Sequence, residues 1–125
     1  TCRDNEGDGV FYCLRVTFSL CKGNIIEKNH GCGISIGGRD TDNWFKGNCI
    51  RNNGRSGIYF RKADRATAGS RNLLDSNILK TNCRQHGDAE IEIDGETADI
   101  HITGNTVCPG AREGRQLCGV RIGVE

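Results

Sequence analysis

The chain reads Asn24-Ile-Ile-Glu-Lys-Asn29-His-Gly-Cys-Gly33-Ile-Ser-Ile36 and then, 24 positions later, Asn48-Cys-Ile-Arg-Asn-Asn53-Gly-Arg-Ser-Gly57-Ile-Tyr-Phe60. In both stretches a second Asn follows the first by five residues, and a Gly with alternating apolar residues comes next. Apolar residues two apart are typical of short strands, whereas a helix would need them three and four apart. The two stretches therefore predict one repeated unit of short strands and tight corners.

The same pattern covers nearly the whole chain of 125 residues. Looser copies begin at Asn77 and Asn105, and residues 1–12 fit the later part of the unit. The leading Asn residues are 24, 29 and 28 positions apart, and the extra residues fall in polar stretches such as 62–70. Insertions confined to loops are typical of stacked repeats. We predict one all-β domain over residues 1–125, a parallel β-helix of about five coils.

Apolar residues at matching positions of the repeats form the expected core. One coil cannot bury them alone, so they should stack in columns along the solenoid. The four predicted columns are Cys2, Ile26, Ile50, Leu79, Val107; Val10, Ile34, Ile58, Ile91, Val120; Tyr12, Ile36, Phe60, Ile93, Ile122; and Cys21, Phe45, Leu74, Ile102.

Asparagine also recurs at two positions of the repeat. Asn tolerates left-handed backbone and suits tight corners, and stacked amides can hydrogen-bond to one another along the axis. We therefore assign these residues a structural role. The two columns are Asn24, Asn48, Asn77, Asn105 and Asn5, Asn29, Asn53, Asn82.

The Asn-x-Ile-x-x-Asn pattern followed by Gly-Ile-x-Ile, with turns of this length, resembles the right-handed parallel β-helix of the pectate-lyase-like superfamily. The resemblance implies a substrate groove along one sheet and a polysaccharide, often acidic, as the partner. It is specific for fold, because the superfamily spans lyases, hydrolases, adhesins and non-catalytic modules. The leading hypothesis is an extracellular carbohydrate-active region: a polysaccharide lyase, a glycoside hydrolase, or the sugar-binding part of one.

Outward positions of the Gly-Ile-x-Ile strands supply the candidate site. Tyr59, Arg61, Glu92 and Asp94 are expected on adjoining coils of one face. Tyr59 and Arg61, with Ser35 and Arg121 on the same face, would hold the sugar. Glu92 and Asp94 would be the catalytic acid and base, since paired carboxylates cleave glycosidic bonds.

The segment Glu90-Ile-Glu92-Ile-Asp94 is the densest acidic strand of the chain. Strand alternation predicts that Glu90, Glu92 and Asp94 lie on one side while the two Ile residues face the core. Calcium is the candidate cofactor for such a set, because it takes oxygen ligands. The alternative is a solvated strand face whose charges discourage edge pairing.

The charge and the hydropathy of the chain limit the classes of partner that it can bind. The formal net charge is +1, from 17 basic and 16 acidic residues, so the chain lacks the positive excess that nucleic acids or acidic membranes require. No apolar run approaches the length of a membrane-spanning helix. A cluster of basic residues, Arg61, Lys62, Arg65 and Arg71, surrounds the longest loop. It is either a solvated insertion or a wall that grips an acidic sugar.

The eight cysteines favour disulfides in an extracellular protein. Cys13 with Cys21, Cys108 with Cys118, and Cys49 with Cys83 are the pairings considered, and the connectivity stays open. Several of these residues could instead be small buried thiols.

A second hypothesis belongs to another functional class. Neither end of the chain carries an amphipathic capping helix, which predicts uncapped sheet edges and a chain that is part of a longer solenoid. Open edges would also allow copies to associate end to end. The chain would then be a structural module of a spike, adhesin or filament.

Overall fold

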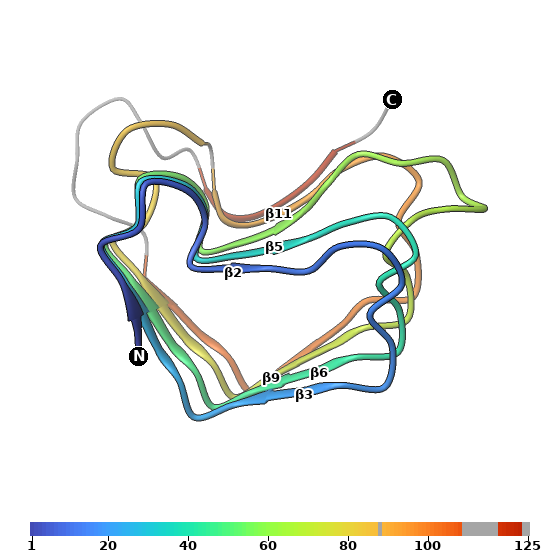
Figure 1. Cartoon of the computed structure of the whole chain (residues 1–125), viewed down its shortest axis with the longest axis horizontal. Coiled ribbons are helices and arrows are strands. Elements are labelled where there is room, and N and C mark those ends of the chain that lie inside the picture. The colour runs from blue at the N-terminus through green and yellow to red at the C-terminus, as the bar shows by residue number, and fades with distance from the viewer. Residues whose placement is uncertain (88, 109–117, 124–125) are drawn as a thin grey trace.

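The computed structural model describes residues 1–87, 89–108 and 118–123. These residues form short strands and turns without any helix, and every strand pair is parallel. Within this described part no helix is long and apolar enough to cross a membrane. The chain winds as a parallel β-solenoid whose turns lie one behind another in Figure 1.

Each complete turn consists of three strands. The first is β1 (Cys2–Arg3), β2 (Val10–Phe11) and β3 (Leu20–Lys22); the second is β4 (Ile25–Glu27), β5 (Ile34–Ile36) and β6 (Trp44–Lys46); the third is β7 (Cys49–Arg51), β8 (Ile58–Phe60) and β9 (Leu73–Asp75); the fourth is β10 (Ile78–Lys80), β11 (Ala89–Ile93) and β12 (His101–Thr103). After these four turns, β13 (Thr106–Cys108) and β14 (Cys118–Ile122) begin another. The predicted five coils counted this partial turn as a whole one.

Equivalent strands of successive turns build three sheets. The first sheet has the order β1-β4-β7-β10-β13, the second β14-β11-β8-β5-β2 and the third β12-β9-β6-β3. In Figure 1 the second and third sheets face each other across the core, and residues of the long insertion after β8 project beyond the turns at the right.

The strand register confirms the four predicted core columns, which are buried in the middle turns, whereas their last members Ile102, Val120 and Ile122 are exposed. Ile26 pairs with Ile50, Ile34 with Ile58, and Phe45 with Leu74, each one turn apart. These side chains are fully buried in the middle turns. The first described turn leaves Phe11, Leu14, Phe18 and Leu20 exposed.

Asparagine ladders close the corners of the solenoid. In one of them, the side chain of Asn53 accepts bonds from Asn29 and donates to Asn82, with N···O distances of 2.9 and 2.7 Å between the amides. In the other predicted ladder, Asn48 donates to Asn77 at 2.9 Å. The predicted stacking of amides is therefore correct.

The cysteines differ from the prediction of disulfides. None of the seven whose side chains the structure describes forms a disulfide. Cys21 and Cys83 are buried and Cys13 is exposed, so the considered pairings of Cys13 with Cys21 and of Cys49 with Cys83 do not form. The physical reason is that Cys21 faces the core, where its thiol contacts Asn24 and Asn48. The pairing of Cys108 with Cys118 lies outside the described side chains.

Candidate functional site

The predicted site residues lie side by side on the second sheet. The register aligns Ser35 with Tyr59, Tyr59 with Glu92, and Glu92 with Arg121, each on the next strand. The five residues Tyr59, Arg61, Glu92, Asp94 and Arg121 are called here the carboxylate face. Because parallel strands stack about 4.8 Å apart, a short oligosaccharide along the axis would pass several of these side chains.

One arginine holds both carboxylates of this face. Arg121 Nε lies 3.0 Å from Glu92 Oε1, and Arg121 Nη2 lies 3.0 Å from Asp94 Oδ1. Ser56 donates a hydrogen bond to the other oxygen of Glu92. Tyr59 donates its hydroxyl proton to Asp94 Oδ2 over 3.1 Å. One connected polar network therefore joins the side chains of Ser56, Tyr59, Glu92, Asp94 and Arg121.

Burial and the neighbouring carboxylate act together on Tyr59. Desolvation is the larger cause and the hydrogen bond to Asp94 the next, and both raise the pKa of the phenol. Tyr59 therefore stays protonated and acts as a hydrogen-bond donor around neutral pH. Glu92 is only 7% exposed, whereas Asp94 is the more accessible carboxylate.

Arg61 reaches back over the earlier turns. Its Nη1 donates to Ser35 Oγ at 2.6 Å, and its Nη2 donates to the carbonyl oxygen of Tyr12 at 2.7 Å. The guanidinium carbon lies 4.1 Å from the centre of the exposed Phe11 ring. Gly37 permits this path, since a Cβ there would lie 1.7 Å from Arg61 Nη2. Ser35 was predicted to contact sugar, yet it is buried beneath Arg61.

Strand alternation predicted that Glu90 lies on the same side as Glu92 and Asp94, and this prediction is wrong. It is fully buried and its carboxylate accepts bonds from the backbone and side-chain nitrogens of Asn82. The ladder that runs from Asn53 to Asn82 therefore continues to Glu90, whose carboxylate accepts from Asn82 as Asn82 Oδ1 accepts from Asn53. The reason is that the position before the core Ile points inward: at Gly57, the equivalent residue one turn earlier, a Cβ would lie 2.8 Å from Leu79 Cδ2 and 2.9 Å from Asn82 Nδ2.

The three carboxylates that were candidate calcium ligands already have partners within the protein. Both oxygens of Glu90 are occupied by Asn82, and Glu92 and Asp94 are bound to Arg121. Within the part of the chain that the structure describes, no group of three or more His, Cys, Asp or Glu side chains could hold a metal ion.

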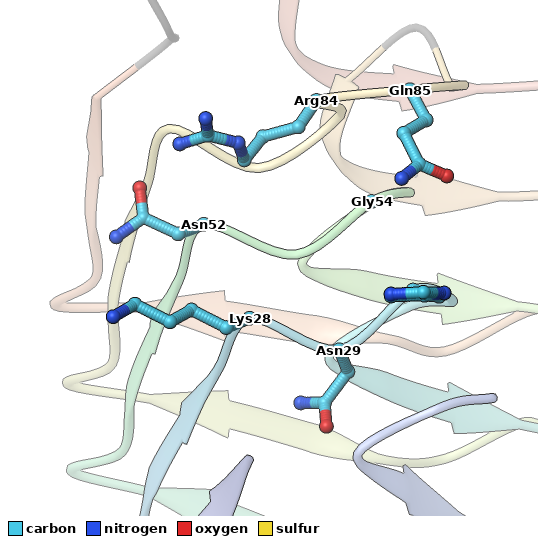
Figure 2. A pocket seen from close by; sticks show the side chains of 7 residues that line it. Lys28, Asn29, Asn52, Gly54, Arg84 and Gln85 are labelled. Carbon is cyan, nitrogen blue, oxygen red and sulfur yellow. The ribbon is translucent and has the colours of Figure 1, made fainter. Parts of the chain in front are cut away.

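Two hollows lie at corners of the solenoid, away from the carboxylate face. Figure 2 shows the first, about 300 Å³ in volume, where Lys28, Asn52 and Arg84 come from three successive turns and Gln85 lies above Gly54. Lys28 and Arg84 give it a basic lining. The second hollow, of about 280 Å³, lies between the second and third sheets.

Sequence reasoning missed two features of these corners. Asn43 and Asn72 extend a third ladder, in which Asn43 N donates to Asn72 Oδ1 at 2.9 Å. Arg15 and Arg39 line the second hollow. The sequence contained a sign of both features, because the two residues of each pair precede equivalent strands of the repeat. Arg15 and Arg39 are also separated by 24 residues, which is the common repeat spacing.

A comparison with protein-family models, curated proteins and solved structures finds no match to this chain. The fold therefore rests on the repeat and the strand register, and membership of the pectate-lyase-like superfamily is not shown.

Proposed function

We propose that the chain binds an acidic polysaccharide along its carboxylate face, as the sugar-binding part of an extracellular, pectate-lyase-like carbohydrate-active β-helix. The observation that carries the proposal is the connected network of Tyr59, Asp94, Arg121 and Glu92 on successive strands. It combines an aromatic ring, a guanidinium and carboxylates, which together recognise the ring face, the carboxylate and the hydroxyls of a sugar.

Arg121 gives the proposal a preference for acidic sugars. A uronate carboxylate can take the place of Asp94 at Arg121 Nη2, where Asp94 accepts one hydrogen bond in the free protein. Its binding would release Asp94, the more exposed carboxylate of the two. In the catalytic version of the proposal, the released Asp94 is the general base, which takes the proton at C5 of the uronate in a lyase or a proton of the attacking water in a hydrolase. Glu92 is the general acid, which gives its proton to the glycosidic oxygen as the bond to that oxygen breaks.

Binding to an array of neutral and uronic-acid oligosaccharides, with and without calcium, tests this proposal. The variant Arg121→Gln should weaken binding of uronic-acid ligands by about tenfold or more, since it removes the charged donor that the uronate carboxylate would take from Asp94. Assays for new reducing ends and for unsaturated sugar ends then separate hydrolase, lyase and binding-only behaviour.

Arg51→Gln is the matched control. Arg51 is also an arginine paired with a nearly buried carboxylate, Glu27 at 2.8 Å, but it lies on the first sheet. It should leave glycan binding unchanged. Absence of glycan binding by the folded wild type, or equal losses in both variants, would contradict the assignment.

A second candidate function is a structural module that assembles end to end. The observation in its favour is the exposed apolar edge of the first described turn, where Leu14 and Phe18 are 82% and 83% exposed. A second copy stacked on this edge would bury these side chains. Sedimentation over a range of concentrations should then show rods that disappear in Leu14→Ser/Phe18→Ser, while Ile25→Ser, at an exposed site on β4, retains them. A monomer at every concentration would contradict assembly.

A further inference from the structure

The second hollow gathers positive charge from three turns of the solenoid. Arg15 comes from the first turn, Arg39 from the second and Arg65 from the insertion of the third. Thr17 and Thr41 belong to the same lining, and the hollow has a volume of about 280 Å³. A water molecule occupies about 30 Å³ in the liquid, so the hollow has room for a small anion and part of the group that carries it.

Backbone contacts hold this lining in place. Thr17 and Thr41 form a parallel bridge, and Thr41 N donates to Val16 O at 3.1 Å. This register sets Arg15 and Arg39 one turn apart, or about 4.8 Å along the axis. The inserted loop joins the same corner, because Arg39 N donates to Thr67 O at 2.7 Å.

Neighbouring acids do not neutralise these arginines. Asp42 is bound by both Nε and Nη2 of Arg71, at 3.0 Å each. Asp40 is fully buried and accepts backbone N–H groups of Val16 and Gly37.

Glu96 meets the inserted loop only at the backbone, where it accepts from Arg65 N at 2.7 Å. Among the described residues, no carboxylate forms an ion pair with the guanidinium of Arg15, Arg39 or Arg65. Three uncompensated cations therefore line one hollow.

We propose that this arginine hollow binds a tetrahedral oxoanion, a sulfate or phosphate group. Arginine and threonine residues that can donate hydrogen bonds come from three turns. A tetrahedral anion presents acceptor oxygens in several directions, whereas a carboxylate presents two in one plane. The site shares no residue with the carboxylate face, so it does not depend on the function proposed above. An ester on a saccharide and the free inorganic ion offer the same chemistry.

Titration of isotope-labelled protein with inorganic sulfate or phosphate, at constant ionic strength against chloride, tests the hollow directly. Backbone amide signals of Arg15, Thr17 and Thr41 should shift with saturation. The double variant Arg15→Gln/Arg39→Gln should weaken binding by about tenfold or more. Lys22→Gln/Lys80→Gln removes two exposed positive charges elsewhere and should leave the affinity unchanged.

The outcomes separate a built site from general electrostatic attraction. Linear, unsaturated shifts in the wild type, or the same weakening in both double variants, would overturn the proposal. The wild-type titration stands even if the arginine variant fails to fold.

A sulfated oligosaccharide and its desulfated counterpart identify the source of the anion. Tighter binding of the sulfated form than of inorganic sulfate, with no shift from the desulfated form, assigns the hollow to an ester on a saccharide. Equal or tighter binding of the inorganic ion assigns it to the free anion. Glu92→Gln/Asp94→Asn should not alter the shifts at this corner, which keeps the test independent of the carboxylate face.

Discussion

Replacing Asn53 by alanine should remove a central member of a corner ladder. Asn53 is fully buried. Its Oδ1 accepts from the backbone and side-chain nitrogens of Asn29, at 3.1 and 2.9 Å. Its Nδ2 donates to Ile26 O at 3.2 Å and to Asn82 Oδ1 at 2.7 Å. The substitution therefore deletes four hydrogen bonds and leaves polar partners in a dry corner.

The expected cost follows from these contacts. A hydrogen bond contributes about 1 kcal/mol net, and a buried group left without its partner costs about 1–3 kcal/mol. Asn53→Ala should thus lower the free energy of unfolding by about 4 kcal/mol. Asn5→Ala is the matched control, because Asn5 is exposed and its side chain donates a single hydrogen bond, of 2.8 Å, to Asn29 Oδ1. It should cost about 1 kcal/mol or less.

Urea unfolding followed by circular dichroism measures both values. The midpoint should fall much further for Asn53→Ala than for Asn5→Ala, with a similar slope if the solenoid still unfolds as one unit. Equal destabilisation by the two variants would refute the view that buried amide ladders stabilise the corners.

Two further predictions concern a thiol and a corner glycine. Burial raises the pKa of Cys32 to about 12, so iodoacetamide at pH 8 should modify the exposed Cys13 and spare Cys32. Peptide mass mapping measures the labelling of each thiol. Comparable labelling of both thiols in the native protein would contradict the prediction. Gly54→Ala should lower the free energy of unfolding by about 1–3 kcal/mol, because the new Cβ would lie 2.1 Å from the backbone oxygen of His30. Gly7→Ala is the control and should change the urea unfolding midpoint little, because the space around Gly7 is open. Similar midpoints for the two variants would count against this reasoning.

The candidate site shows where sequence reasoning reached its limit. Strand alternation correctly grouped Tyr59 with Glu92 on neighbouring strands. It failed at Glu90, because the first part of β11 does not alternate between core and surface: Ala89, Glu90 and Ile91 are all fully buried. It also could not show that Arg121 holds two carboxylates at once, since that depends on the reach of a long side chain across two positions.

The solenoid, its core columns and its asparagine ladders can be predicted from the repeat. These features are periodic, and stacking places equal positions of successive turns in contact, so the repeat alone identifies the partners. The lack of disulfides among the described cysteines, the inward direction of Glu90 and the meeting of Arg15, Arg39 and Arg65 in one hollow became apparent only in three dimensions. Those depend on the path of inserted loops and on side-chain direction at corners, where the period is interrupted and no simple repeat predicts the geometry.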